Sequence, residues 1–190
     1  MDSEGFVADI KGRVLIDALE AIKARSGQTE VAKIVGSLSA ESRKVFESPI
    51  LFSEWYPLDA FVEFLEMDIQ LTAGGDREVL AVRSEKVVEG QLRGIYKIFV
   101  KLGSPGFVIT RIAAVHATYF RGIKIVPQVE SHSATIRYMG FRKQHSIMEF
   151  AIIGFFRKAL AISGAKQVQL KFTVPIAQDD TYLELSITWQ

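Results

Sequence analysis

Residues 167–173, with the sequence QVQLKFT, decide the fold class, because apolar and polar side chains alternate along them. Residues 183–189, LELSITW, repeat this alternation, and the polar segment 177–180, AQDD, lies between the two. Successive side chains of a strand point to opposite faces of a sheet, so the pattern predicts two strands with one buried and one solvated face. We therefore expect an antiparallel hairpin that turns at residues 177–180.

A second hairpin is predicted before the first. Residues 123–129 form one strand, and Ala134, Ile136 and Tyr138 point to one side of the next. Between the hairpins, residues 145–162 are apolar nearly all round, which is typical of a helix covered on more than one side. We expect the sheet on one side of this helix, and the N-terminal helices or a second subunit on the other. The order strand-strand-helix-strand-strand predicts a four-stranded antiparallel sheet.

The part of the chain before this unit is predicted to be mainly helical. Ser39 and Ser104 are suitable N-caps, and Pro57 suits the first turn of a helix because its missing N–H is not needed there. The sequence is thus of the α+β class, and we expect a single domain over residues 1–190, with a mainly helical part at 1–121 and a ββαββ part at 122–190. The expected helices cover approximately residues 10–25, 30–35, 40–46, 57–71, 76–102 and 104–120.

The longest predicted helix carries two glycines one turn apart, Gly90 and Gly94. Glycine lowers helix stability, so the pair predicts that another helix, a partner subunit or a ligand packs closely there. Ala81 and Val88 belong to the apolar stripe of this helix, and Arg83 is assigned to its solvent-facing side.

The composition excludes several classes of function. A net charge of +1 argues against a general nucleic-acid binder. The absence of cysteine excludes disulfides, thiolate metal sites and cysteine nucleophiles. The mean hydropathy of +0.18 is high, yet no apolar run approaches the roughly 20 residues of a membrane-spanning helix. We therefore expect a large core, a ligand cavity or a subunit interface. The acidic N-terminus has no signal-peptide pattern, so we expect a cytoplasmic location.

No motif predicts a catalytic residue, a metal site or a cofactor. The pair Gly74-Gly75 follows a predicted helix rather than a strand, which indicates a helix terminator instead of a phosphate loop. No serine lies in a nucleophile elbow. His116, His132 and His145 lie far apart, without the spacing of a metal-binding motif.

A modest basic cluster lies beside the helix expected to begin near residue 145. Its members are Arg137, Arg142, Lys143 and His145. A helix N-terminus with arginines nearby can bind an anion. A solvated surface is the commoner role for such a cluster, and we favour that interpretation.

The abundant aromatic residues suggest a cavity. An apolar cavity with a few polar tips is the usual form of a small-molecule site, although most aromatic side chains belong to the core. His116 lies in an apolar predicted helix, where it either faces such a pocket or serves as a hydrogen-bonded core histidine, the commoner role. The candidate ligand-binding residues are Trp55, Tyr56, Tyr96, Phe99, His116, Tyr119 and Phe155.

Several short phrases, in their order along the chain, resemble a known family. That family consists of uncharacterised bacterial proteins, abundant in myxobacteria, and is similar to the four-vinyl-reductase-type small-molecule-binding domain. The wider superfamily includes haem nitric-oxide-binding domains and the vesicle-tethering TRAPP subunits. The resemblance covers nearly the whole chain from about residue 10. The phrases are Lys11-Gly12, Ser53-Glu54-Trp55-Tyr56-Pro57, Leu92-Arg93-Gly94-Ile95-Tyr96, Gly103-Ser104-Pro105, Tyr119-Phe120-Arg121-Gly122, Ser163-Gly164-Ala165-Lys166 and Leu185-Ser186-Ile187-Thr188-Trp189.

The resemblance implies an α+β fold with a four-stranded antiparallel sheet, homodimerisation through helices, a sensory or adaptor role and no catalytic residues. Two departures limit what is carried over. Domains of this type often have zinc-binding cysteines around the last hairpin, and this sequence has none. The haem-binding relatives combine a histidine with a Tyr-x-Ser-x-Arg pattern, which Tyr119-Phe120-Arg121 does not reproduce. No zinc or haem is therefore assigned.

Three functional hypotheses follow. The leading one is a non-enzymatic small-molecule-binding or sensory domain that acts as a dimer in bacterial signalling, with an apolar pocket between the long helix and the sheet. The second is a scaffold or adaptor that uses its apolar surface to bind protein partners. The third is an enzyme acting on a hydrophobic small molecule, with His116 or Tyr119 as acid or base; no nucleophile–base pair in the sequence supports it.

Overall fold

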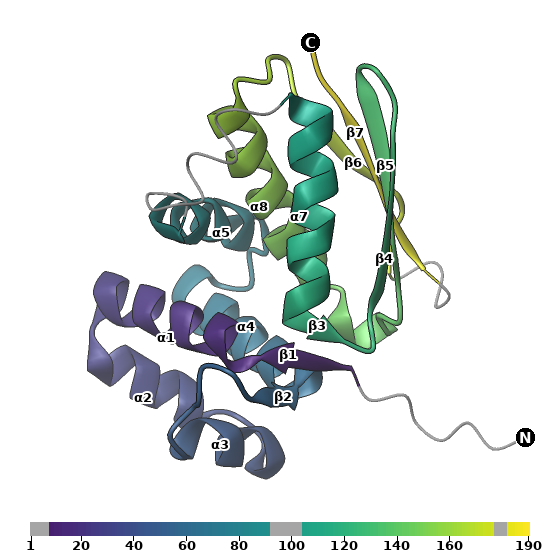
Figure 1. Ribbon diagram of the computed structural model, residues 1–190. Helices are drawn as coiled ribbons and strands as arrows, with labels where there is room; N and C mark the ends of the chain where they lie inside the picture. The colour runs from purple at the N-terminus through teal and green to yellow at the C-terminus, as the bar shows by residue number, and fades with distance from the viewer. Residues whose placement is uncertain (1–7, 92–103, 177–181) are drawn as a thin grey trace, which may run out of the picture.

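The computed structural model describes residues 8–91, 104–176 and 182–190, and it confirms the α+β class (Figure 1). The predicted end of the long helix and the turn at 177–180 lie outside these residues. A short 3₁₀ helix, η1 (Lys143–His145), precedes the last helix. The helices are α1 (Gly12–Ser26), α2 (Gln28–Gly36), α3 (Ala40–Glu47), α4 (Leu58–Ala73), α5 (Glu78–Gln91), α7 (Pro105–Tyr119) and α8 (Met148–Ser163).

The predicted four-stranded antiparallel sheet is present, in the order β4-β5-β7-β6. Its strands are β4 (Lys124–Val129), β5 (Ser133–Met139), β6 (Gln169–Val174) and β7 (Leu183–Thr188). The alternation along the central strands is confirmed, because Ile136, Tyr138, Leu183, Leu185 and Ile187 are all fully buried. Helices α7 and α8 pack against one face of this sheet (Figure 1).

A second, three-stranded sheet was missed by the sequence patterns. It has the order β2-β1-β3, with β1 (Asp9–Lys11), β2 (Trp55–Pro57) and β3 (Phe120–Arg121). The helix expected from about residue 10 therefore begins at Gly12. Strands of two or three residues are too short to show a period, and each of these comes from a different part of the chain.

The start of α1 is fixed by the segment that leads into β2. The first N–H groups of a helix lack partners inside the helix. Here Gly12 N donates to Glu54 O at 2.9 Å and Arg13 N donates to Phe52 O at 3.1 Å. A Cβ on Gly12 would overlap the carbonyl of Leu51 and approach the ring of Tyr56 at 2.8 Å. Only glycine fits this close approach.

The two predicted serine N-caps are confirmed. The hydroxyls of Ser39 and Ser104 accept hydrogen bonds from Ser42 N and Phe107 N, at 3.3 and 3.4 Å. Pro57 is the N-cap of α4 rather than its first helical residue, because it also ends β2. The helix therefore begins at Leu58, one residue later than predicted.

The expected close helix contact occurs at a different glycine. Gly154 in α8 lies so near α5 that an added Cβ would overlap Ala81 O. Ser84 Oγ donates to Ala151 O at 2.8 Å across the same crossing. Apart from the backbone of its own helix and its chain neighbours, no described atom lies within 4 Å of a Cβ built on Gly90, and Gly94 lies outside the described residues. The close approach assigned to these two glycines is therefore not found at Gly90.

Candidate functional site

An apolar cavity of about 160 Å³ lies among the helices, beside β1. It is lined by residues of α1, α4, α5, α7 and α8, including Phe61, Leu65, Leu80 and Ile152. These helices each turn an apolar stripe inward, as expected for helices that cover a core. The stripes meet around the cavity without filling it.

Helix α1 follows the cavity along most of its length. Val14, Ala18, Ile22 and Arg25 all line it, and their spacing of three or four residues places them on one face of the helix. At a rise of about 1.5 Å per residue, the path from Val14 to Arg25 is roughly 16 Å long. The lining residues near the two ends of this path differ in chemistry, and they are called here the aromatic end and the charged end.

The aromatic end is built around His116, on the last turns of α7. Its Nδ1 lies 2.9 Å from the hydroxyl of Tyr138, which comes from the central strand β5. The rings of Phe155 and Phe156 lie 4.6 and 5.7 Å away by centroid. Burial lowers the pKa of His116 to about 4 and raises the pKa of Tyr138. Both groups are therefore neutral at pH 7.

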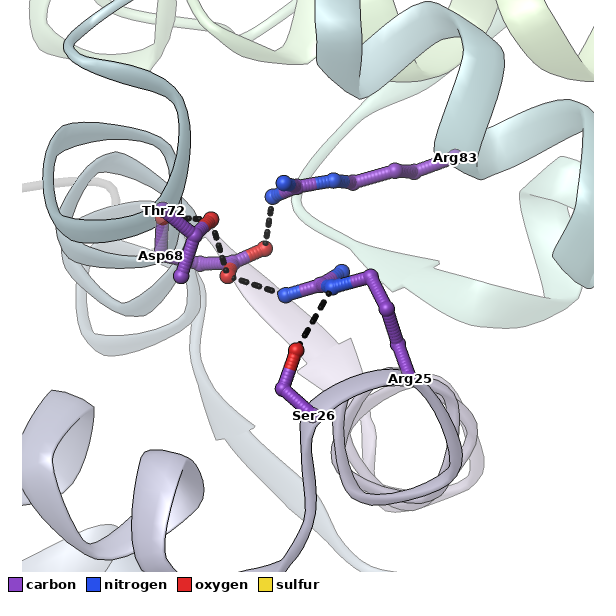
Figure 2. Close-up of polar contacts among 5 residues, drawn as sticks. All are labelled: Arg25, Ser26, Asp68, Thr72 and Arg83. Carbon is purple, nitrogen blue, oxygen red and sulfur yellow. Dashed lines mark hydrogen bonds and ion pairs between the residues drawn. The ribbon is translucent and has the colours of Figure 1, made fainter.

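The charged end is a cluster of two arginines around one buried carboxylate (Figure 2). Asp68 of α4 accepts from Arg25 Nη2 at 2.6 Å and from Arg83 Nη1 at 2.8 Å. Thr72 Oγ1 also donates to Asp68 Oδ1, at 3.1 Å. The side chain of Asp68 is 3% exposed, whereas those of Arg25 and Arg83 are 31% and 17% exposed. The cluster joins α1, α4 and α5, and all three charged residues line the cavity.

The structure brings together three of the seven residues predicted to form a ligand site. His116, Tyr119 and Phe155 line the cavity. Tyr96 and Phe99 lie outside the described residues.

Trp55 and Tyr56 lie elsewhere, in β2. The ring of Trp55 is contacted by the Lys11 ammonium at 4.1 Å and the Arg121 guanidinium at 4.6 Å. The hydroxyl of Tyr56 accepts from Leu51 N at 2.8 Å. The contacts of these two aromatic residues therefore stabilise the three-stranded sheet, and neither residue lines the cavity.

The sequence patterns missed the charged end of the cavity. The sequence pattern places Arg83 on the solvent-facing side of its helix, whereas in the structure its side chain bonds to Asp68. One signal was present for Asp68: with Phe61 and Leu65 it forms an i, i+4, i+7 series on the apolar stripe of α4. A carboxylate on such a stripe needs cationic partners when it is buried. Nothing in the sequence identifies Arg25 and Arg83 as those partners.

Three of the four members of the basic cluster near residue 145 contact carboxylates within the fold. Arg137 pairs with Glu184 at 2.6 Å, and Arg142 pairs with Asp59. His145 is fully buried, with Nε2 2.7 Å from Asp59 Oδ1, while Nδ1 accepts from Arg142 N at 3.0 Å. These contacts favour a structural role over an anion site.

No group of three metal-binding side chains occurs within the described ranges. Nor does any described helix have the length and apolar character needed to cross a membrane.

The fold is similar to that of H-NOX proteins of known structure. An H-NOX protein from K. algicida, in the Fe(II) unliganded form, is 15% identical with a TM-score of 0.71, covering 95% of this chain and 97% of its own. One from S. oneidensis in the Fe(II)NO state is 12% identical with a TM-score of 0.71, covering 95% and 99%. A T. tengcongensis H-NOX mutant is 11% identical with a TM-score of 0.66, covering 95% and 98%.

No protein-family model and no curated protein matches the sequence. The similarity to the solved structures therefore establishes the fold alone.

Proposed function

We propose that this domain binds a small apolar molecule and acts as a sensory, non-enzymatic module in bacterial signalling. The observation that carries the proposal is the apolar cavity of about 160 Å³. The cavity is partly open to solvent, so a ligand can enter it. A ligand that fills it would remove the apolar walls from water, which favours binding. The H-NOX fold supports a sensory role, since proteins with this fold are described with Fe(II) and NO.

Haem is the group that the fold suggests first, because heme distortion has been studied in the H-NOX family. The described residues do not fit it. An apolar cavity of about 150 Å³ holds benzene, and haem is a macrocycle several times larger. The ring of Phe155 also packs against the ring of His116, at 4.6 Å by centroid. The cavity fits a molecule of the size of benzene, so the proposed ligand is small and organic.

The enzyme alternative has weaker support. A general acid or base works best with a pKa near the working pH, whereas burial lowers the pKa of His116 to about 4. Its hydrogen-bond partner is Tyr138, and burial raises the pKa of Tyr138. The pair is therefore better suited to fixing the cavity wall than to transferring protons.

The homodimer implied by the resemblance remains a prediction. Leu51 and Phe52 are adjacent, and each is 58% exposed. They lie in the loop before β2 and not on a helix, so they offer an exposed apolar contact for the protein partner of the scaffold hypothesis rather than for the helix-mediated dimer.

A cavity-filling variant tests the proposal. Benzyl alcohol is a suitable probe, because it has one aromatic ring and no charge. Its binding should raise the melting temperature of the wild-type protein, since a ligand that binds only the folded state stabilises it. Ala21 lines the cavity, so Ala21→Phe should fill part of it and abolish this shift.

Ala24→Phe is the matched control, because Ala24 is exposed on the same helix. It should retain the wild-type response. An equal response in all three proteins would place the probe elsewhere and contradict the proposal, as would the absence of any response in the wild type.

A further inference from the structure

We propose that the ligand is a small apolar monocarboxylate, whose carboxylate binds Arg83 and Arg25 while its apolar body lies toward His116. This inference rests on the proposed function and adds the chemical class of the ligand. The argument starts from the charges on the cavity wall. Asp17 is paired with Arg13, at 2.8 Å, whereas Asp68 is shared by two arginines. Two cations thus face one anion at the charged end.

The arginines retain hydrogen-bonding capacity. A guanidinium has five N–H donors in a planar fork. The contacts of Arg83 within the described residues use one nitrogen, Nη1, which donates to Asp68. Arg25 uses Nη2 for Asp68 and Nε for Ser26 Oγ, at 3.2 Å. The remaining donors suit a second carboxylate, because guanidinium groups bind planar carboxylates in a bidentate manner.

The surroundings assign the two parts of the ligand to opposite ends. At the other end, His116 and Tyr138 are neutral and packed among phenylalanine rings, so that end offers no cation. Between the ends, Val14, Ala18 and Ile22 present apolar groups, and the carboxylate of Asp17, which also lines the cavity, is paired with Arg13 at 2.8 Å. Apolar walls exclude water and strengthen the attraction between a carboxylate and a guanidinium.

The size of the cavity limits the apolar body to a single aromatic ring or a short aliphatic chain. The cavity of about 160 Å³ matches one that holds benzene. Benzoate combines such a body with one carboxylate. Benzyl alcohol has nearly the same shape without the charge, so the two probes separate the head group from the body.

Isothermal titration calorimetry on the wild-type protein is the first test, and it needs no variant. Benzoate should bind at least about tenfold more tightly than benzyl alcohol, because a hydrogen bond to a charged group contributes more than one between neutral groups. Raising the salt concentration should weaken only benzoate. Equal affinities would overturn the carboxylate proposal and leave the proposed function intact. No binding of either probe would overturn both.

Arg83→Met then tests the assigned residue. It removes the charge, keeps an apolar stem and leaves the Arg25–Asp68 pair in place. Benzoate affinity should fall about tenfold or more, while benzyl alcohol affinity stays unchanged. Arg157→Met is the control, because Arg157 pairs with Glu85 on α5 and does not line the cavity. An equal loss for both probes in Arg83→Met, or unchanged benzoate binding, would overturn the role of Arg83.

Discussion

At the scale of single residues, Asp68 is a buried carboxylate held by partners from three helices. It lies on the buried face of α4, and its carboxylate is held by guanidinium groups from α1 and α5. A buried ion is costly unless it is paired and hydrogen-bonded, and here Thr72 and two arginines supply the partners. The fold therefore depends on Asp68 more than on the surface pairs around it.

Replacing Asp68 with asparagine should lower the free energy of unfolding by about 2–3 kcal/mol, because it leaves two arginines facing each other without an anion. Urea denaturation measures this change. Glu85→Gln breaks the exposed pair with Arg157 and serves as the control, with an expected cost below about 1 kcal/mol. Equal costs for the two variants would contradict the central place given to Asp68.

The two buried histidines predict how stability depends on pH. Burial lowers the pKa of both His116, to about 4, and His145. In the unfolded chain each returns to about 6.5. The unfolded state therefore binds more protons below that pH, and stability falls as the pH decreases from 6.5 toward 4. For His116 alone the shift corresponds to about 3 kcal/mol at the acidic end.

His116→Phe should remove part of this dependence, since phenylalanine does not titrate. Urea unfolding at pH 7.5 and pH 4.5 should show a smaller difference in stability for the variant than for the wild type. Identical pH dependence in the two proteins would mean that His116 is not the buried neutral group described above.

At the scale of elements, the crossing of α5 and α8 fixes one wall of the cavity. Gly154 allows the backbones to approach, and Ser84 bonds to Ala151 O across the contact. Ser84 and Ala151 also line the cavity, so the shape of the site depends on this crossing. A side chain at Gly154 would push the two helices apart.

Gly154→Ala should lower the free energy of unfolding by about 1–3 kcal/mol, although alanine favours helix by about 1 kcal/mol elsewhere. Gly90→Ala on α5 should instead be neutral or stabilising, because no described atom lies near its added methyl group. Chemical denaturation of both variants measures the change in the free energy of unfolding and therefore its sign in each. Stabilisation by Gly154→Ala would contradict the close crossing.

At the scale of the whole molecule, regular elements were predictable and long-range groupings were not. The strands around Leu170 and Leu185 alternate apolar and polar residues over enough positions to be recognised from the sequence. Strands β1, β2 and β3 are too short to show such an alternation. Tyr119 and Phe155 come together at the cavity because apolar stripes converge on one core. Arg25 and Arg83 resemble ordinary helix charges until the fold brings them to Asp68.

We propose that residues 1–190 fold as a single domain, as the sequence suggested. One buried cluster contains Ile10 and Leu58 from the helical part together with Ile136 and Leu185 from the sheet. Thermal unfolding should therefore show one transition, coincident in far-ultraviolet circular dichroism and tryptophan fluorescence. Two separated transitions would indicate that the helical and ββαββ parts fold independently.

The central claim is that the apolar cavity is a ligand site. Titration of isotope-labelled protein with benzyl alcohol, followed by heteronuclear NMR, tests it most directly. We predict saturable shifts concentrated at cavity-lining residues such as Val14, Ile22, Leu65 and Ile152, and their loss in Ala21→Phe. Shifts confined to surface residues, or none at concentrations that saturate comparable cavities, would contradict the account.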